Sequence, residues 1–345
     1  MRETNEQHSL ISRRKFLELC SAGAALTLAP SLCSLSQAIR GTTPASTPEA
    51  TQLAVSGWVK SKFNPVLGGS LGTCYDVCVL QEGNQYRMWF SWRPQKSIAL
   101  VESGDGIHWS SPEISLAPDA STGWEDEIDR PIVLKLADGY AMWYSAQSKT
   151  YSRIGYATSP DGRKWTRVSK DPVLSPDVAW EGNGVMCPDV IYDPSQATFR
   201  MWYSGGNFGE PIAIGYATSK DGIHWDKLSS NPIFSPFPGH FWEQDRVTAC
   251  QVLQHGKWHL MFYIGFSDAN HAQIGLARSK DGISDWERHP ANPIIRPDVG
   301  KWDGDSVYKP FAIFDKDHWY LWYNGRLGGS EQIGLAIHAG EDLGF

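Results

Sequence analysis

Carboxylate side chains gather where each apolar segment of a repeated pattern begins. Five stretches lead into these segments; each carries at least one Asp or Glu, and three also carry an Arg or Lys. Carboxylates crowded around one cleft shift each other's pKa values apart, so that one holds a proton while its partner is ionised. Such a pair can cleave a glycosidic bond. The expected catalytic residues are Asp76, Asp129, Asp189 and Asp245.

Cations and aromatic rings in the same stretches are suited to hold a substrate. Arginine and lysine can fix an ionised carboxylate and donate hydrogen bonds to hydroxyl groups. Tryptophan can stack its apolar face on a sugar ring. The residues expected to bind the substrate are therefore Arg130, Arg246, Asp305, Lys309, Trp124, Trp242 and Glu181.

A structural role is the alternative interpretation for part of this set. A Trp followed by Glu or Asp recurs at the same place in four of the five stretches, as expected of a turn whose carboxylate caps backbone N–H groups. The recurring carboxylates are Glu125, Glu181, Glu243 and Asp303. The carboxylates that do not recur are the better candidates for chemistry.

The elements that must position these residues are also repeated. The pattern Ile-Gly-x-Ala-x-Ser-x-Asp-Gly precedes Trp165, Trp225 and Trp286, with a degenerate copy before Trp109 and a truncated copy at 332–337. The Asp-Gly pair suits a tight turn, and it recurs in nearly every unit. We therefore interpret this phrase, including its two His residues at positions 108 and 224, as scaffold.

Each unit contains four short strands at a period near 60 residues, and no segment has helical periodicity. This arrangement predicts an all-β fold, a five-bladed β-propeller of four-stranded antiparallel blades. The last unit lacks its fourth strand, whereas Trp58 and the following Asn64-Pro65-Val66-Leu67 match that strand and its exit. We expect the N-terminal strand of the mature chain to close the ring, which removes exposed sheet edges.

The N-terminal residues fit the pattern of an export signal. Ser12-Arg13-Arg14-Lys15-Phe16-Leu17 fits a twin-arginine motif, an apolar stretch follows at 19–35, and Ser36-Gln37-Ala38 fits a cleavage site. The expected domains are a signal peptide at 1–38, a linker at 39–56 and the propeller at 57–345. We expect a bacterial protein that the twin-arginine translocase exports to the periplasm or beyond, with no membrane span in its mature form. A fortuitous Arg-Arg pair and a lipoprotein anchor at Cys33 are the weaker alternatives.

The net charge and the cysteine spacing restrict the classes of partner, metal site and disulfide that the chain can have. The net charge is −7 and no basic run follows residue 15, which disfavours nucleic acid. Four cysteines remain after processing, and their spacing matches no zinc pattern. Cys74 and Cys78 are too far apart on one strand to bridge each other. Four buried thiols are expected, with a Cys187–Cys250 disulfide as the alternative.

The repeat and its acidic entry stretches resemble the five-bladed propeller glycosidases, glycoside hydrolase families 32, 43, 62, 68 and 130, over about residues 57–337. The resemblance implies a base or nucleophile Asp on the first blade, a supporting Asp on the second and an acid Glu on the third. Asp76 matches the first position. Asp129-Arg130-Pro131 resembles the second, although family 32 has Arg-Asp-Pro there, so the Asp is displaced by one residue.

The third position departs from the family. Val185-Met186-Cys187-Pro188-Asp189 resembles the Glu-Cys-Pro-Asp stretch of family 32, with Met186 in the place of the acid. Glu181, Asp189 or Asp245 would then have to supply the acid. The sequence therefore predicts an exported glycosidase acting on an oligo- or polysaccharide, with a non-catalytic carbohydrate-binding propeller as the alternative and a phosphorylase as a third choice. No cofactor and no metal ligand set is expected, and the sequence leaves a structural Ca²⁺ open.

Overall fold

Short antiparallel strands make up nearly all the regular structure of the residues that the structure describes. The computed structural model describes residues 55–345, where the elements are strands and single 3-10 turns. The all-β class predicted from the sequence is thereby confirmed. The predicted signal peptide and residues 39–54 of the predicted linker lie outside the described residues. The part of the chain that the structure describes contains no helix with the length and apolar character of a membrane span.

The strands form five repeats of one design. Repeat 1 comprises β2 (Cys74–Glu82), β3 (Gln85–Trp92), β4 (Ser97–Ser103) and β5 (Glu113–Leu116); repeat 2 comprises β6 (Glu127–Leu136), β7 (Gly139–Ser148), β8 (Tyr151–Ser159) and β9 (Thr166–Arg167); repeat 3 comprises β10 (Gly184–Asp193), β11 (Thr198–Asn207), β12 (Glu210–Ser219) and β13 (Asp226–Lys227); repeat 4 comprises β14 (Arg246–His255), β15 (Trp258–Phe266), β16 (Ala272–Ser279) and β17 (Glu287–Arg288); and repeat 5 comprises β18 (Ser306–Asp315), β19 (His318–Leu327) and β20 (Ser330–Ala339), with β1 (Trp58–Lys60) beside them.

Short 3-10 turns connect the strands: η2 (Val55–Gly57), η3 (Gly69–Leu71), η4 (Arg93–Gln95), η5 (Ala120–Thr122), η6 (Ala179–Glu181) and η7 (Phe241–Glu243). Within each repeat, strands that follow one another in the sequence pair antiparallel. Repeats 2 and 3 are joined into one sheet by a parallel bridge between Gly184 and Ser152.

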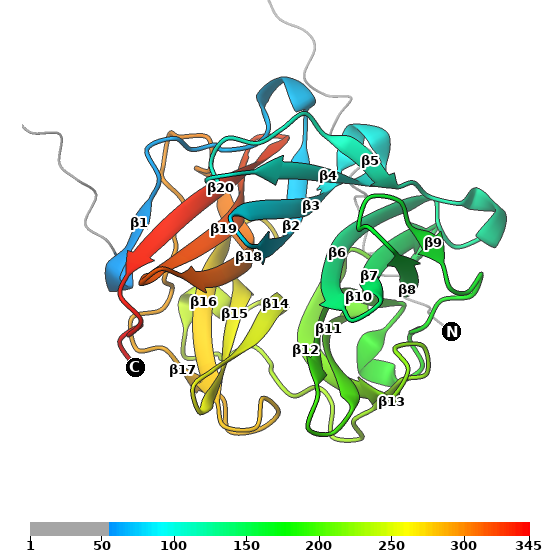
Figure 1. The fold of residues 1–345 in the computed structure, drawn as a ribbon. Coiled ribbons are helices and arrows are strands. Elements are labelled where there is room, and N and C mark those ends of the chain that lie inside the picture. The colour runs from blue at the N-terminus through cyan, green and yellow to red at the C-terminus, as the bar shows by residue number, and fades with distance from the viewer. Residues whose placement is uncertain (1–54) are drawn as a thin grey trace, which may run out of the picture. The chain divides into compact units, whose positions relative to one another are not determined.

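The first strand of the described chain pairs with the last. In the antiparallel β1–β20 ladder, Trp58 lies opposite His338. The first strands of the repeats, β2, β6, β10, β14 and β18, pack against one another in that order, and β18 also packs against β2. Figure 1 shows these first strands turned toward one another, with the later strands of each repeat outside them.

The second strands bury the aromatic core and connect neighbouring repeats. Trp89, Trp143, Trp202 and Trp322 are completely buried. Each donates its indole N–H to a glycine carbonyl in the Asp-Gly turn of another repeat, with distances of 2.8–3.0 Å for the pairs Trp89–Gly162, Trp143–Gly222, Trp202–Gly282 and Trp322–Gly106. The last of these bonds runs from repeat 5 to repeat 1.

The Asp-Gly turns have the structural role that the repeat suggested. In repeat 3, one carboxylate oxygen of Asp221 accepts the backbone N–H groups of Ile223 and His224, both at 2.8 Å. Gly222 has a φ of +78°, and a Cβ there would lie 2.8 Å from the Trp143 ring. Only glycine fits both the backbone and this close approach.

Candidate active site

Each first strand carries a β-bulge near its beginning, and these bulges build the candidate site. Pairing with the second strand is interrupted at the same place in every repeat. The second residue of each bulge has a φ between 38° and 54°. A bulge re-aims side chains away from the regular alternation. Five pairs of residues are therefore equivalent: Tyr75–Asp76, Asp129–Arg130, Met186–Cys187, Thr248–Ala249 and Tyr308–Lys309.

The bulges are held in place by the preceding repeat. A residue other than glycine at positive φ costs about 1–3 kcal/mol and needs support from its surroundings. The bulge N–H groups of Arg130, Cys187 and Ala249 donate to serine hydroxyls of the preceding second strand at 2.8–2.9 Å. In repeat 1, the N–H of Asp76 donates instead to the amide oxygen of Asn324, from repeat 5, at 2.9 Å.

Asp76 and Asp129 lie on either side of one guanidinium group. Arg130 Nη1 is 2.5 Å from Asp129 Oδ2, and Arg130 Nε is 3.5 Å from Asp76 Oδ2. Asn324 also donates to Asp76 Oδ1 at 3.2 Å, and Gln147 donates to Asp129 Oδ2 at 3.0 Å. The structure thus brings together two of the four predicted catalytic carboxylates and one predicted binding cation.

Burial raises the pKa of both carboxyl groups. Asp76 and Asp129 are 4% and 1% exposed. The loss of water raises the pKa of Asp129 to about 7, although Arg130 opposes the shift. Burial raises the pKa of Asp76 as well, against the effects of Arg130 and Lys309. Asp129 Oδ1 is buried without a hydrogen-bond partner among the described residues. Asp129 can therefore hold a proton close to neutral pH.

Lys309 brings an ammonium group to the same region. It is 3% exposed, and its charge acts on the pKa values of Asp76 and of Cys187. The same charge also acts to lower the pKa values of Asp189 and Cys250. An ammonium group in this position can donate hydrogen bonds to a bound ligand.

Four residues that the sequence did not single out surround this cluster. Glu331 accepts a hydrogen bond from the Tyr308 hydroxyl at 2.5 Å and pairs with Arg93 at 2.8 Å. The Arg93 guanidinium lies 4.5 Å from the centre of the Tyr75 ring. Tyr75 and Tyr308 stand in the entry stretches already considered, beside predicted residues. Arg93 and Glu331 lie outside them, so no sequence signal linked them to the site.

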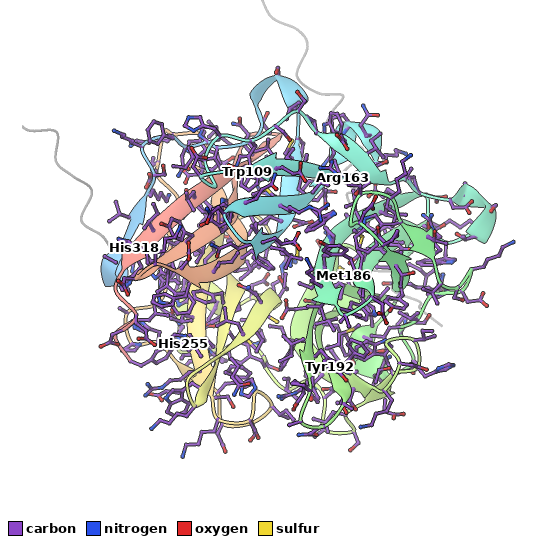
Figure 2. All side chains as sticks on the ribbon, in the orientation of Figure 1. Trp109, Arg163, Met186, Tyr192, His255 and His318 are labelled. Carbon is purple, nitrogen blue, oxygen red and sulfur yellow. The ribbon has the colours of Figure 1, made fainter. Side chains whose placement is uncertain are left out.

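Repeats 3 and 4 contribute an apolar side to this arrangement. Met186 and Cys187 pack with Ala249 and Ile264, and Tyr308 packs against this group. Met186 is completely buried and lies on β10 (Figure 2). The position at which the resemblance placed an acid is therefore apolar here, and the charged side chains of the bulge pairs all belong to repeats 1, 2 and 5.

Asp189 lies two residues beyond its bulge and bridges repeats. Its Oδ2 accepts the Val252 N–H at 2.7 Å. Cys78 and Gln251 occupy the equivalent position in their repeats and also contact the backbone of another repeat, at Val133 and Ala312. Burial raises the pKa of Asp189 to about 7. Its position indicates a role between repeats and argues against the predicted catalytic one.

Glu181 belongs to a structural set, as the alternative interpretation held. It is completely buried, accepts the Tyr203 hydroxyl at 2.7 Å and pairs with Lys227 at 2.7 Å. The other recurring carboxylates repeat this design with a tyrosine and a cation, in the groups Glu125–Tyr144–Arg167, Glu243–Tyr263–Arg288 and Asp303–Tyr323–Lys60. Glu181 is therefore not available as the acid or as a substrate ligand.

The predicted aromatic platforms are also enclosed in the scaffold. Trp124 and Trp242 are 5% and 8% exposed. Trp124 stacks on Tyr144, and a Cβ at Gly265 would lie 2.3 Å from the Trp242 ring. Rings so covered have no free face for a sugar, which argues against the predicted stacking role.

The remaining predicted residues lie at the entries to β14 and β18. Asp245 is exposed and 3.6 Å from Arg246, whose guanidinium covers the Phe266 ring. Asp305 accepts the Gly328 N–H at 2.7 Å and so ties the entry of β18 to the turn between β19 and β20. None of these three makes a hydrogen bond or ion pair with the Asp76–Asp129 cluster within the described residues.

The thiols are free and buried in the described region. Cys74, Cys78, Cys187 and Cys250 all lack a disulfide partner, so the Cys187–Cys250 bridge is not formed. Residues 55–345 contain no group of three or more His, Cys, Asp or Glu side chains arranged to hold a metal ion.

Comparison by sequence finds partial matches. A Mycobacterium tuberculosis protein named "Uncharacterized protein Rv1502" is 33% identical over 142 residues, covering 38% of this chain and 46% of that protein. The 1,2-beta-oligomannan phosphorylase of Thermoanaerobacter sp. (strain X514) is 27% identical over 189 residues, covering 52% and 55%. The chain thus spans about half the length of these relatives. No protein-family model matches the sequence.

Comparison of folds finds carbohydrate-active enzymes. A thermostable family-43 glycoside hydrolase matches with a TM-score of 0.64 and 19% identity over 79% of this chain and 91% of that one. A structure from work on the GH130 family of mannoside phosphorylases, a family said to contain glycoside hydrolases that target β-1,2 mannosidic linkages in Candida mannan, matches with a TM-score of 0.61 and 18% identity, over 79% and 87%. The resemblance to propeller-type glycoside hydrolases is confirmed at the level of the fold.

Proposed function

We propose that the repeats form a five-bladed β-propeller closed by β1, with the bulge pairs at its channel mouth. Contacts between repeats 5 and 1 support closure, since Asn324 binds Asp76 and Trp322 binds Gly106. β1 also supplies a cation that repeats 2, 3 and 4 take from their own fourth strands. Lys60 pairs with Asp303 as Lys227 does with Glu181.

The proposed reaction of this site is cleavage of a glycosidic bond by hydrolysis. The observation that carries it is the pair of buried carboxyl groups around one guanidinium, Asp76 and Asp129 with Arg130. Asp129, whose pKa lies at about 7, donates the proton to the leaving oxygen. Asp76, whose Oδ1 accepts an amide N–H and whose raised pKa is opposed by both Arg130 and Lys309, is assigned as the ionised partner that activates water or attacks the sugar. This assignment replaces the expectation that Glu181, Asp189 or Asp245 supplies the acid.

Lys309 and Arg130 are the proposed substrate ligands in this site. Both present N–H donors next to the carboxyl pair, and the Lys309 charge acts on the pKa of Asp76. Donors placed beside the reacting carbon can bind sugar hydroxyls and stabilise charge that develops in the transition state. An oligo- or polysaccharide is the substrate class that such donors suit.

Phosphorolysis and non-catalytic binding are the two alternatives. Relatives named phosphorylases favour the first, because two cations beside the carboxyl pair could also hold phosphate. The buried Met186 favours the second, because the third repeat lacks an acid.

Turnover assays separate these functions. The purified protein would be screened on aryl-glycosides and on manno-, xylo- and arabino-oligosaccharides, with and without inorganic phosphate. We expect turnover without phosphate, reduced at least ~10³-fold in Asp76→Asn and Asp129→Asn. Asp226→Asn, an exposed carboxylate on β13, is the matched control and should keep full activity. Turnover only with phosphate would establish phosphorolysis, and sugar binding by calorimetry without turnover would establish a binding protein.

Export by the twin-arginine route belongs to the same proposal, as does a reaction that needs no cofactor. Cell fractionation should find the native protein outside the cytoplasm, and a variant with Arg13→Lys and Arg14→Lys inside it.

Chelation with EDTA should leave turnover unchanged; a loss restored by Ca²⁺ would contradict the cofactor-free reaction.

A further inference from the structure

A cavity of about 550 Å³ lies between repeats 2 and 3, away from the bulge pairs. Its lining comes from these two repeats alone and includes Tyr140, Thr158, Tyr192 and Phe199. Asp129 lies near the start of β6, whereas the cavity reaches Leu136 at the end of that strand. The cavity is therefore distinct from the candidate active site.

The equivalent groove between repeats 1 and 2 is filled by charged side chains. The Arg87 guanidinium lies 5.2 Å from the centre of the Tyr140 ring and donates to the Asp161 carbonyl at 2.9 Å. Glu82 pairs with Arg87 at 3.3 Å and also with Lys135. These side chains occupy the groove between repeats 1 and 2.

Between repeats 2 and 3 the filling residues are replaced. The strand registers show that Ala141 takes the place of Arg87; their cross-strand partners are Thr158 and Glu102. In the same way, Tyr192 takes the place of Lys135, and their cross-strand partners are Phe199 and Tyr140. Leu136 takes the place of Glu82. The cavity thus results from substitutions that remove an arginine and the ions that held it.

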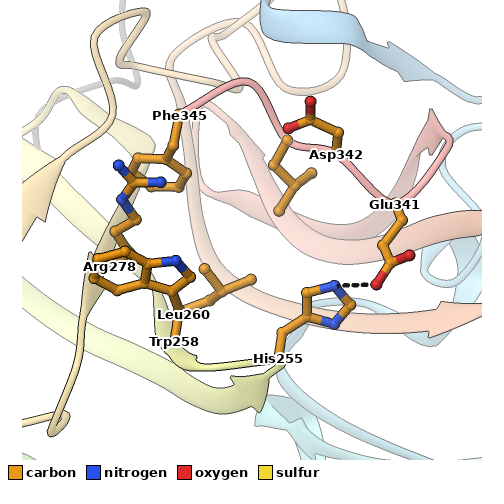
Figure 3. A pocket seen from close by; sticks show the side chains of 8 residues that line it. His255, Trp258, Leu260, Arg278, Glu341, Asp342 and Phe345 are labelled. Carbon is orange, nitrogen blue, oxygen red and sulfur yellow. Dashed lines mark ion pairs between the residues drawn. The ribbon is translucent and has the colours of Figure 1, made fainter.

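Repeats 3 and 4 show the same two arrangements at this position, a groove filled by an arginine and an open cavity. Arg200 fills the next groove, with its guanidinium 5.1 Å from the Trp202 ring and a bond to the Asp281 carbonyl. Leu260 stands at the equivalent position in repeat 4, and that groove is a cavity of about 340 Å³ (Figure 3). The C-terminal tail contributes to its lining, with Glu341 2.9 Å from His255.

We propose that the cavity between repeats 2 and 3 is a second saccharide-binding site, remote from the reacting carboxylates. Tyr192 is 42% exposed and packs 4.9 Å from Phe199, so aromatic surface is open to a sugar face (Figure 2). Thr158, Thr166 and Asp138 supply hydroxyl and carboxylate partners around it. The choice of a saccharide as the ligand rests on the proposed function, whereas the existence of the cavity is independent of it.

The volume and charge of the site favour a short sugar segment over a protein surface or an ion. A cavity of this volume is typical of small-molecule sites. The cation in its lining, Lys220, is already bound to Gln196 O at 2.8 Å and Thr198 Oγ1 at 2.6 Å. The hydroxyls, the ring faces and the Asp138 carboxylate, which can accept from sugar hydroxyls, suit an uncharged sugar.

Affinity electrophoresis in gels containing yeast mannan, arabinan or xylan tests the site. We expect one of these polysaccharides to retard the native protein, and Tyr192→Ala to raise the dissociation constant at least about tenfold. Tyr151→Ala, which removes a tyrosine of similar exposure on β8, should bind as the native protein does. Ala141→Arg should refill the groove and abolish retardation, with its melting temperature measured to verify folding.

The outcomes separate this site from the catalytic one. Retardation that persists in Asp129→Asn and is lost in Tyr192→Ala supports the second site, even if no substrate is turned over. Retardation equal in native protein, Tyr192→Ala and folded Ala141→Arg overturns it, and so does absence of retardation in all three gels.

Discussion

At the scale of single residues, burial determines which carboxyl group can carry a proton. Asp129 and Asp189 are both buried, and burial raises the pKa of each to about 7. Asp129 stands in a bulge pair beside Asp76 and Arg130, whereas Asp189 accepts a backbone N–H from another repeat. The two residues therefore have similar pKa values but different roles, and their positions relative to the bulge distinguish these roles.

The proposed role of Asp129 predicts the pH dependence of turnover. A proton donor must be protonated, so kcat/KM should fall as pH rises above about 7 and approach a tenfold loss per pH unit. A kcat/KM profile from pH 4 to 9 measures this limb. A basic limb below pH 5, or none at all, would remove Asp129 from the role of acid.

Asp189 predicts a pH dependence of stability that does not involve catalysis. Its pKa in the folded state is raised above the ordinary value near 3.9, so its stabilising effect is complete below about pH 4 and is lost as pH rises through about 7. At pH 8 the buried carboxylate costs up to ~4 kcal/mol. Asp189→Asn should therefore shrink the loss of unfolding free energy between pH 5 and pH 8.

Urea unfolding at the two pH values provides that measurement, with the exposed Asp226→Asn as control. An Asp189→Asn protein whose stability changes with pH as much as the native protein would refute the explanation. Loss of turnover in a stable Asp189→Asn protein would return this residue to the catalytic set.

At the scale of elements, a carboxylate, a tyrosine and a cation fasten the outer strand in repeats 2 to 5. In repeat 3, Glu181 joins Tyr203 of β11 to Lys227 of β13. Lys227 also pairs at 2.7 Å with Asp177, whose side chain is 66% exposed. Buried and exposed carboxylates thus share one cation, which makes them a matched pair for measurement.

Glu181→Ala should lower the free energy of unfolding by about 3–5 kcal/mol, because it removes the fully buried carboxylate that accepts from the Tyr203 hydroxyl and from Lys227. Asp177→Ala should lower it by less than ~1 kcal/mol, since exposed ion pairs contribute little. Chemical denaturation compares the two. Equal effects would show that burial does not govern this contact.

At the scale of the whole molecule, the start of the chain completes the sheet formed by its end. β1 pairs with β20, and Asn64 then donates to the Leu335 carbonyl at 2.9 Å and accepts the Leu335 N–H at 2.8 Å. Without these residues, β20 would present an unpaired edge. The two ends of the described chain are therefore expected to fold together.

Deletion of residues 58–67 should abolish cooperative unfolding and promote aggregation, because it exposes β20 and leaves Asp303 without Lys60. Calorimetry and light scattering would compare this protein with one lacking only residues 1–38. A single sharp transition at an unchanged melting temperature in the deletion variant would contradict the importance of this pairing.

The sequence by itself determined the repeating strands and proposed several residues of the candidate site. The recurring phrases before Trp165 and Trp225 indicated a repeated β unit, because turn chemistry and strand alternation depend on residues close together in the chain. The same reasoning identified the non-recurring Asp76, Asp129, Arg130 and Lys309. The recurrence of a carboxylate at the position of Glu181 in four repeats also indicated a structural role for Glu181 as the alternative.

Only the tertiary structure decided which of these residues act together. The bulge makes Arg130, and not Asp129, the equivalent of Asp76, and a one-residue displacement changes where a side chain points. Arg93 and Glu331 reach the cluster from η4 and β20, more than 230 residues apart in sequence. Burial, which raises the pKa of Asp129 and encloses Trp124, depends on packing between repeats. Such contacts join distant parts of the chain, so local patterns do not reveal them.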